Sequence, residues 1–205
     1  MTESDLIEQR LQRQRGRRTF FGILLAFFGP LALAIFLFAN LELWNPVNTA
    51  NHGELMEPVR PLPFLNLQQS SGETLTLESV KGRWTLVLVV DGDCDLDCQT
   101  DLFKMRQARA ALGRDLVRVQ YLYLALDDLS GSAGEKMQSE HPKMLLGRVA
   151  DQDRDQQILA FEEQPQGFVY LLDPLGNLVL RYDDQSTTKG IVKDLKRLLK
   201  VSKIG

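Results

Sequence analysis

The chain has 205 residues, of which 44% are hydrophobic and 25% charged, and its formal net charge is −3. These proportions are typical of an ordinary folded protein and exclude a disordered or fibrous one. The slightly acidic balance argues against a nucleic-acid partner, because phosphate binding needs a concentrated basic surface and the basic residues here are scattered or near the termini. We expect one folded domain with an appendage.

The appendage is a long apolar segment near the N-terminus. Residues 19–41 contain no charged side chain, and at 1.5 Å per residue they are long enough to cross a hydrocarbon core of about 30 Å. A cleaved signal peptide is the rival interpretation, but its apolar region is only about 7–15 residues long and ends at a small-x-small site, which Phe38-Ala39-Asn40 does not match. The segment therefore predicts one transmembrane helix.

The charges that flank this segment predict its orientation. Five arginines precede it within residues 1–18, and no Lys or Arg follows it until Arg60. Cytoplasmic flanks carry the excess of Lys and Arg, so residues 1–18 are expected to be a cytoplasmic tail. The acidic residues in this tail argue against a mitochondrial transit peptide. We therefore predict a single-pass protein of the bacterial inner membrane, with its C-terminal domain in the periplasm.

The part that follows is expected to hold a linker and one domain. Residues 42–63 contain four prolines and little apolar periodicity, which predicts a linker, and residues 64–205 are expected to form the domain. Residues 64–67 and 74–77 flank a Ser-Ser-Gly turn, a pattern that predicts a β-hairpin.

Two apolar runs indicate the core of the domain. Residues 84–90 (WTLVLVV) and 117–126 (VRVQYLYLAL) are rich in β-forming residues, as in strands buried on both faces. Between them, residues 98–112 place apolar side chains at helical spacing, with Gly113 as a stop. The three segments predict a βαβ unit with parallel strands.

The remaining elements complete the expected fold. Residues 135–146 predict an amphipathic helix, residues 168–172 and 178–182 two antiparallel strands around a tight turn, and residues 190–200 a closing helix. This order predicts an α/β domain: a thioredoxin-like mixed sheet with flanking helices and an N-terminal hairpin, preceded by one transmembrane helix.

The two cysteines of the chain, Cys94 and Cys98, lie where the first core strand is expected to end and its helix to begin. A helix N-terminus stabilises a thiolate, and residues four apart on a first helical turn point the same way. The pair could cycle between dithiol and disulfide or bind Cu(I), which prefers sulfur ligands. A structural disulfide or two inert thiols are the alternatives, although a bridge that closes so short a loop constrains the unfolded chain little.

Acidic residues crowd the same loop: Asp91, Asp93, Asp95, Asp97 and Asp101. Their charge opposes the helix dipole and disfavours a thiolate nearby. The alternation is similar to that of a calcium-binding EF-hand loop, but Leu96 stands where that loop needs glycine and Leu102 where it needs glutamate. We expect a solvated acidic loop and helix start.

A membrane anchor followed by LTLESVKGRWTLVLVV, a Cys-x-x-x-Cys motif, VRVQYLYLALDD and FVYLLDPLGNLV resembles the Sco/SenC family of copper chaperones over about residues 60–200. The resemblance implies a thioredoxin-like fold, a role in delivering copper to cytochrome c oxidase or acting on its thiols, and Cys94 and Cys98 as the copper-binding or redox pair. The family's third ligand is a histidine shortly before the strand that ends in Asp-Pro-x-Gly. Residues 164–167 (QPQG) contain none.

The chain has two histidines, His52 and His141, and each is expected to be exposed and without a ligand role. The leading hypothesis is a Sco-like protein that assists assembly of cytochrome c oxidase, by thiol redox chemistry or by handling Cu(I) through Cys94 and Cys98, with an oxidase subunit or another membrane-bound respiratory protein as partner. The alternatives are a thiol-disulfide oxidoreductase with no metal, and a non-catalytic accessory module.

Overall fold

The computed structural model describes residues 3–39, 51–69, 71–127, 132–162 and 165–204. It divides into two compact units, residues 1–49 and 50–205. The first unit holds helix α1 (Glu3–Ala39), within which residues 20–39 have a mean hydropathy of 2.5 and are long and apolar enough to span a membrane. The side chains of this stretch are largely exposed, as a membrane anchor requires. The predicted span of residues 19–41 agrees with the helix up to Ala39, and residues 40 and 41 lie outside the described part.

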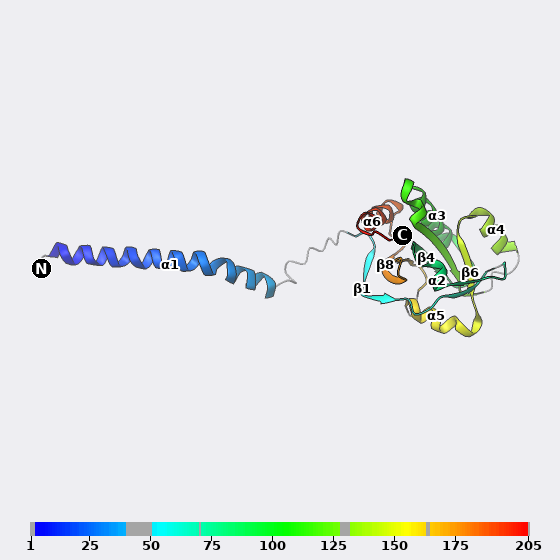
Figure 1. The fold of residues 1–205 in the computed structure, drawn as a ribbon, viewed down its shortest axis with the longest axis horizontal. Helices are drawn as coiled ribbons and strands as arrows, with labels where there is room; N and C mark the ends of the chain where they lie inside the picture. The colour runs from blue at the N-terminus through cyan, green and yellow to red at the C-terminus, as the bar shows by residue number, and fades with distance from the viewer. Residues whose placement is uncertain (1–2, 40–50, 70, 128–131, 163–164, 205) are drawn as a thin grey trace. The chain divides into compact units, whose positions relative to one another are not determined.

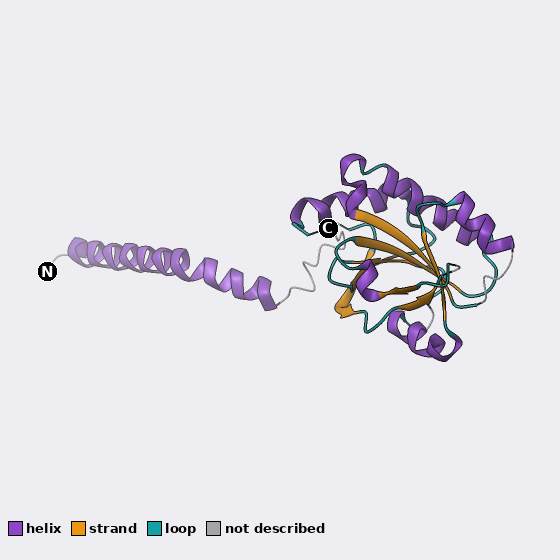
Figure 2. Ribbon diagram, turned by 45° about the vertical axis from the view of Figure 1, so that its right-hand side comes forward, coloured by secondary structure: helices purple, strands orange, loops and turns teal. Residues whose placement is uncertain are grey.

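The second unit is built around one mixed sheet with the strand order β1-β8-β7-β4-β5-β6-β2-β3. Figure 2 shows this sheet with helices on both of its faces. The strands are β1 (Glu54–Pro61), β2 (Asn66–Gln68), β3 (Thr74–Thr76), β4 (Trp84–Val90), β5 (Val119–Ala125), β6 (Leu145–Val149), β7 (Val169–Leu172) and β8 (Asn177–Tyr182). Strands β4, β5 and β6 run parallel, and the other pairings are antiparallel.

The centre of the sheet is the β4–β5 pair, and it is confirmed as predicted. Every residue of both strands is buried, which explains why their sequences read as continuous apolar runs rather than alternating ones. The register pairs Leu88 with Tyr123 and Val90 with Ala125. Both strands therefore end at the same edge of the sheet, and the loop that carries the cysteines leaves β4 at this edge.

Helices cover the two faces of the sheet. Helices α3 (Leu96–Ala110), α4 (Ser132–Glu140) and α6 (Thr188–Val201) contribute to the core on one face, and α2 (Leu77–Val80) and α5 (Arg154–Phe161) to the core on the other. Short 3₁₀ turns, η2 (Gly113–Arg118) and η3 (Asp151–Asp153), precede β5 and α5. Helices α3 and α6 lie side by side (Figure 1). A mixed sheet between helix layers confirms the predicted fold class.

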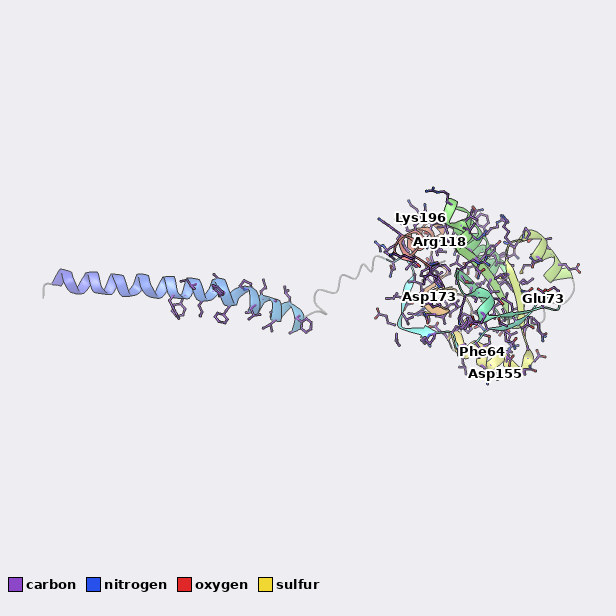
Figure 3. The ribbon with its side chains drawn as sticks, viewed as in Figure 1. Phe64, Glu73, Arg118, Asp155, Asp173 and Lys196 are labelled. Atoms are coloured by element: carbon purple, nitrogen blue, oxygen red, sulfur yellow. A yellow bond between two sulfur atoms is a disulfide. The ribbon has the colours of Figure 1, made fainter. Side chains whose placement is uncertain are left out.

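Side chains form hydrogen bonds with backbone groups at both ends of the C-terminal helix α6. Arg118, labelled in Figure 3, donates from Nη1 to the Leu199 carbonyl at 3.0 Å and from Nη2 to the Ser202 carbonyl at 2.9 Å. These bonds satisfy carbonyl groups that the helix end leaves without intrahelical partners. At the other end, the Thr187 hydroxyl accepts from the Gly190 N–H at 3.1 Å and caps the helix.

Two expectations need correction, and one helix was not expected. Residues 54–61, expected to belong to the linker, form the edge strand β1, which pairs with β8. Its prolines are tolerated because an edge strand needs partners on one side only. The helix expected over residues 135–146 ends at Glu140, and residues 145–149 form β6 between β5 and β2. The helix α5 was not predicted at all. Residues 51–53 and 62–63 of the expected linker flank β1, and residues 42–50 lie outside the described residues.

Candidate functional site

The loop that follows β4 turns the chain directly into α3. Gly92 has a φ of 81°, a left-handed conformation that glycine adopts without strain. Asp95 is the N-cap of α3, and its Oδ1 atom accepts from the Cys98 N–H at 2.9 Å. The aspartate between the cysteines therefore has a local structural role that its residue type explains, since Asp is among the best N-cap residues.

Cys94 and Cys98 form a disulfide, with 5.3 Å between their Cα atoms. The expectation that both lie on the first helical turn is wrong, because Cys94 precedes the N-cap and only Cys98 is helical. The Cys98 side chain is buried in the core between α3 and the sheet, whereas Cys94 is partly exposed and packs against the edge of that core. Of the two cysteines, Cys94 is thus the more accessible to solvent.

Arg154, at the start of α5, connects the ends of the two central strands. Its guanidinium donates to Asp91 Oδ1 at 2.6 Å and to Asp127 Oδ1 at 2.5 Å. The hydrogen bond from Arg154 holds the pKa of Asp127 below its ordinary value. The same pair of carboxylates raises the pKa of Arg154. Asp91 is therefore an ion-pair partner of Arg154 and not only a solvated residue of an acidic loop. The sequence does not predict this pair, because the two residues are 63 positions apart.

Asp101, expected to be part of the same acidic loop, lies in the second turn of α3 and is buried. Lys104 Nζ donates to its Oδ1 at 3.0 Å and also to the Asp184 carbonyl at 3.0 Å. Burial raises the pKa of Asp101, and the bond from Lys104 offsets part of that rise. Asp93, Asp95 and Asp97 remain exposed. The prediction of a solvated acidic loop is therefore confirmed for these three residues.

Tyr123 on β5 is a buried polar residue of this region that sequence reasoning missed. The side chain is fully buried in the same core as Cys98, and its hydroxyl has no hydrogen-bond partner among the described residues. Burial, together with a smaller contribution from the Asp93 carboxylate, raises the pKa of Tyr123 to about 12, so the hydroxyl stays neutral at physiological pH. Orphaned buried hydroxyls are uncommon in folded proteins.

Replacement of Tyr123 by phenylalanine is expected to raise the free energy of unfolding by about 1 kcal/mol, because the hydroxyl is desolvated and receives no bond in return. Chemical denaturation of the full-length protein in detergent measures the change. Tyr170→Phe is the matched control: the Tyr170 hydroxyl donates to Glu162 Oε2 at 3.1 Å, and its loss should destabilise the protein by about 1 kcal/mol. A destabilised Tyr123→Phe variant would contradict the prediction.

The two histidines lie apart from the cysteines in the chain and differ in their surroundings. His52 is exposed, as expected, and its Nδ1 is 3.2 Å from Oδ1 of the buried Asp194 on α6. His141, before β6, is half-buried against the Tyr121 ring with 6.3 Å between ring centroids. Its Nδ1 is buried without a partner among the described residues. The expectation of an exposed side chain is wrong for His141.

Burial lowers the pKa of His141 below its ordinary value of 6.5, and the positive charge of Arg106 lowers it further. Below pH 6.5 the unfolded chain therefore binds more protons at this position than the folded protein does. The free energy of unfolding should fall as the pH drops from 7 to 5. His141→Gln should show a smaller fall over the same range in denaturation curves measured at each pH. Equal slopes for the two proteins would contradict this assignment.

Copper binding needs a set of ligand atoms, and the described residues supply the two sulfurs of Cys94 and Cys98. Once reduced, Cys94 and Cys98 would offer two soft thiolates to Cu(I). No group of three or more His, Cys, Asp or Glu side chains that could hold a metal is found in the part of the chain that the structure describes. Where the family resemblance implies a histidine, Pro165 is buried and Gln166 and Gly167 are exposed, while Gln164 lies outside the described residues.

A family model described as the transmembrane-like, thioredoxin-like, C-terminal domain matches residues 84–202. No curated protein matches the sequence. Among solved structures, yeast Sco1 with copper bound is 18% identical with a TM-score of 0.63, and the match covers 72% of this chain and 96% of that one. The thioredoxin domain of a thiol-disulfide oxidoreductase from Bacteroides vulgatus is 14% identical, with a TM-score of 0.54 and coverage of 67% and 94%.

A third similar structure is BsSco, described as a member of the Sco family of cytochrome c oxidase assembly proteins with a disulfide switch. It is 16% identical with a TM-score of 0.56, and the match covers 71% of this chain and 96% of that one. At these identities the likeness shows the fold. The resemblance to the Sco/SenC family that the sequence predicts is thus confirmed at the level of the fold, because Sco proteins are among the structures similar to this chain.

Proposed function

Since the chain belongs to the family of transmembrane-like, thioredoxin-like C-terminal domains, we propose that it is a membrane-anchored thiol-disulfide protein. Its Cys94–Cys98 pair exchanges electrons with cysteines of a partner protein during assembly of the copper centre of a respiratory oxidase. The observation that carries the proposal is the disulfide at the junction of β4 and α3, with one partly exposed and one buried cysteine. This asymmetry suits a nucleophile and a resolving thiol.

The exchange would proceed in two steps from the reduced form. The Cys94 thiolate attacks one sulfur of the partner's disulfide, that S–S bond breaks, and the other partner sulfur leaves as a thiolate that takes a proton from water. Cys98 then attacks the Cys94 sulfur, which re-forms the 94–98 disulfide and releases the second partner thiolate. Two electrons pass to the partner, and an external dithiol reductant must restore this protein.

The membrane topology supports the same role. With the arginine-rich N-terminus in the cytoplasm, the C-terminal unit would lie in the periplasm of a bacterial inner membrane. A disulfide can form and persist there, and membrane-embedded oxidases are within reach of a tethered domain. The structures similar to this chain include an oxidase assembly protein with a disulfide switch, which supports a respiratory partner.

The reduction potential of the full-length protein in detergent tests this proposal. The fraction of reduced Cys94–Cys98 pair is measured in glutathione buffers of known potential. A value between about −300 and −150 mV supports a pair that exchanges electrons with other proteins. A value well below about −300 mV would instead indicate an inert structural bridge and favour a non-catalytic accessory module.

Transfer of Cu(I) is the second candidate function, favoured by the copper-bound Sco1 structure among the similar ones. Here Cu(I) is the cargo, and two thiolates would bind it with no third ligand from the described residues. Titration of the reduced protein with Cu(I) in competition with a chelator of known affinity distinguishes this from redox chemistry. Binding at sub-micromolar free copper that is lost in Cys94→Ser and Cys98→Ser would support it.

A further inference from the structure

The outward face of α3 carries two large exposed apolar side chains, Leu96 within the disulfide loop and Phe103 two turns farther along the helix. Leu96, which lies between the two cysteines in the sequence, is 79% exposed, and Phe103 is 53% exposed. Seven residues make about two turns, so both side chains are on the same side of the helix. Single exposed apolar residues are common on protein surfaces, but two on one helix face that begins within the disulfide loop indicate a contact surface.

Negative charge borders the end of this face that is nearest to the disulfide. Asp93 and Asp97 are exposed and form no ion pair within the described part of the chain. Asp91, by contrast, is already paired with Arg154. The basic residues of α3 do not offset the charge of Asp93 and Asp97. Lys104 is bonded to Asp101, and Arg106 and Arg109 lie farther along the helix, where the Arg106 guanidinium is 6.0 Å from the centroid of the Phe103 ring and Arg109 donates to the Val119 carbonyl.

We propose that the face of α3 formed by Leu96 and Phe103, and bordered by Asp93 and Asp97, docks a cysteine-bearing segment of a partner protein with basic and apolar side chains beside its cysteine. This inference rests on the proposed thiol-disulfide function and names the kind of partner that the site takes. Basic side chains are attracted to the two carboxylates and speed encounter, whereas acidic ones are repelled. Apolar side chains gain from covering Leu96 and Phe103.

The same charges argue against two other occupants. An anionic lipid surface attracts basic protein segments and would be repelled by Asp93 and Asp97. A second copy of this chain would bring a like-charged face against this one, at a cost in electrostatic energy. A basic polypeptide is the occupant that the chemistry of this face favours.

The test follows thiol exchange by the reduced full-length protein in detergent. The probes are short peptides in which one cysteine is linked to thionitrobenzoate, whose release is read by absorbance. One peptide carries Leu and Lys beside its cysteine, a second Leu and Glu, and a third Ser and Lys. A neutral small disulfide, dithiodipyridine, reports on the intrinsic reactivity of Cys94.

The Leu-Lys peptide is expected to react at least about 10-fold faster than the Leu-Glu peptide at low ionic strength, with the ratio falling as salt is added. Asp93→Asn/Asp97→Asn should bring the ratio close to one. Leu96→Ser should remove the advantage of the Leu-Lys over the Ser-Lys peptide. Leu96→Ser should leave the rate with dithiodipyridine within about 2-fold of wild type, because a small neutral reagent gains little from the apolar contact. Asp93→Asn/Asp97→Asn removes charge that disfavours the Cys94 thiolate and should raise all rates together, so this variant is judged by the ratio between peptides, which does not depend on the thiolate fraction.

Matched controls lie away from the disulfide loop. Leu175→Ser removes a 64% exposed leucine in the turn between β7 and β8, and Glu73→Gln/Glu78→Gln removes two exposed acidic charges near β3. Neither should change the peptide ratios. Equal rates for all three peptides with wild-type protein, or unchanged ratios in the Asp93/Asp97 and Leu96 variants, would overturn the docking inference. No reaction even with dithiodipyridine would instead overturn the proposed function.

Discussion

Replacement of Cys98 by serine is expected to convert the protein into a covalent trap for its partner. Cys94 can still attack a partner disulfide, but the resolving sulfur is missing, so the mixed disulfide accumulates and multiple turnover is lost. The structural reason is the difference in exposure between the two cysteines, with Cys94 partly exposed and Cys98 in the core. Non-reducing electrophoresis of the variant, incubated in its reduced form with a disulfide-containing substrate, measures the adduct.

Cys94→Ser is the matched control, and it should give no adduct because the remaining thiol is buried. If Cys94→Ser forms the adduct and Cys98→Ser does not, then the nucleophile is Cys98 and the exposure argument is wrong. If neither variant forms one, although the wild-type pair is redox-active, the pair does not react with protein disulfides. Both serine variants should fold, since a bridge that closes so short a loop stabilises the folded state little.

The largest effect on stability is expected from Asp194→Ala. The Asp194 side chain is 2% exposed, and its Oδ2 atom accepts from the His52 N–H at 2.8 Å and from the Gly53 N–H at 2.9 Å. Alanine leaves both N–H groups without their acceptor at the start of β1. We expect a loss of about 2–4 kcal/mol in the free energy of unfolding, the usual range for removing one member of a buried charged network.

Denaturant unfolding of the full-length protein, followed by tryptophan fluorescence, gives this value. Asp194→Asn keeps one carbonyl oxygen and should lose less than the alanine variant. Asp155→Ala, at an exposed position of α5, should change stability by less than about 0.5 kcal/mol. Hydrogen exchange should also become faster in β1 of Asp194→Ala. Unchanged stability of this variant would show that the segment before β1 does not depend on the buried carboxylate.

The features that the sequence predicts correctly depend on neighbours along the chain. A charge-free segment of more than 20 residues indicates a membrane span by length alone. The runs at residues 84–90 and 117–126 indicate central strands because both faces of such strands are apolar. The placement of Cys94 and Cys98 at a strand-to-helix junction follows from the same local patterns, and so does the hairpin at residues 66–76.

The features that only the tertiary structure decided depend on partners far along the chain. Strand β6 is five residues long and contains Gly147 and Arg148, so its pattern is weak, and it is a strand because β5 and β2 supply its hydrogen bonds. Strand β1 tolerates its prolines because β8 pairs with only one of its edges. Short segments of this kind have no strong intrinsic preference for one conformation, and pairing with neighbouring strands decides that they become strands.

The chemistry of the site divides in the same way. The sequence by itself determined which two sulfurs are present, that acidic residues surround them and that residues 164–167 contain no histidine. Only the tertiary structure decided that Cys94 is partly exposed and Cys98 buried, that Arg154 joins Asp91 to Asp127, and that Leu96 faces solvent beside the disulfide. The physical reason is that residue identity is local, whereas exposure and ion pairing are set by which distant segments pack together.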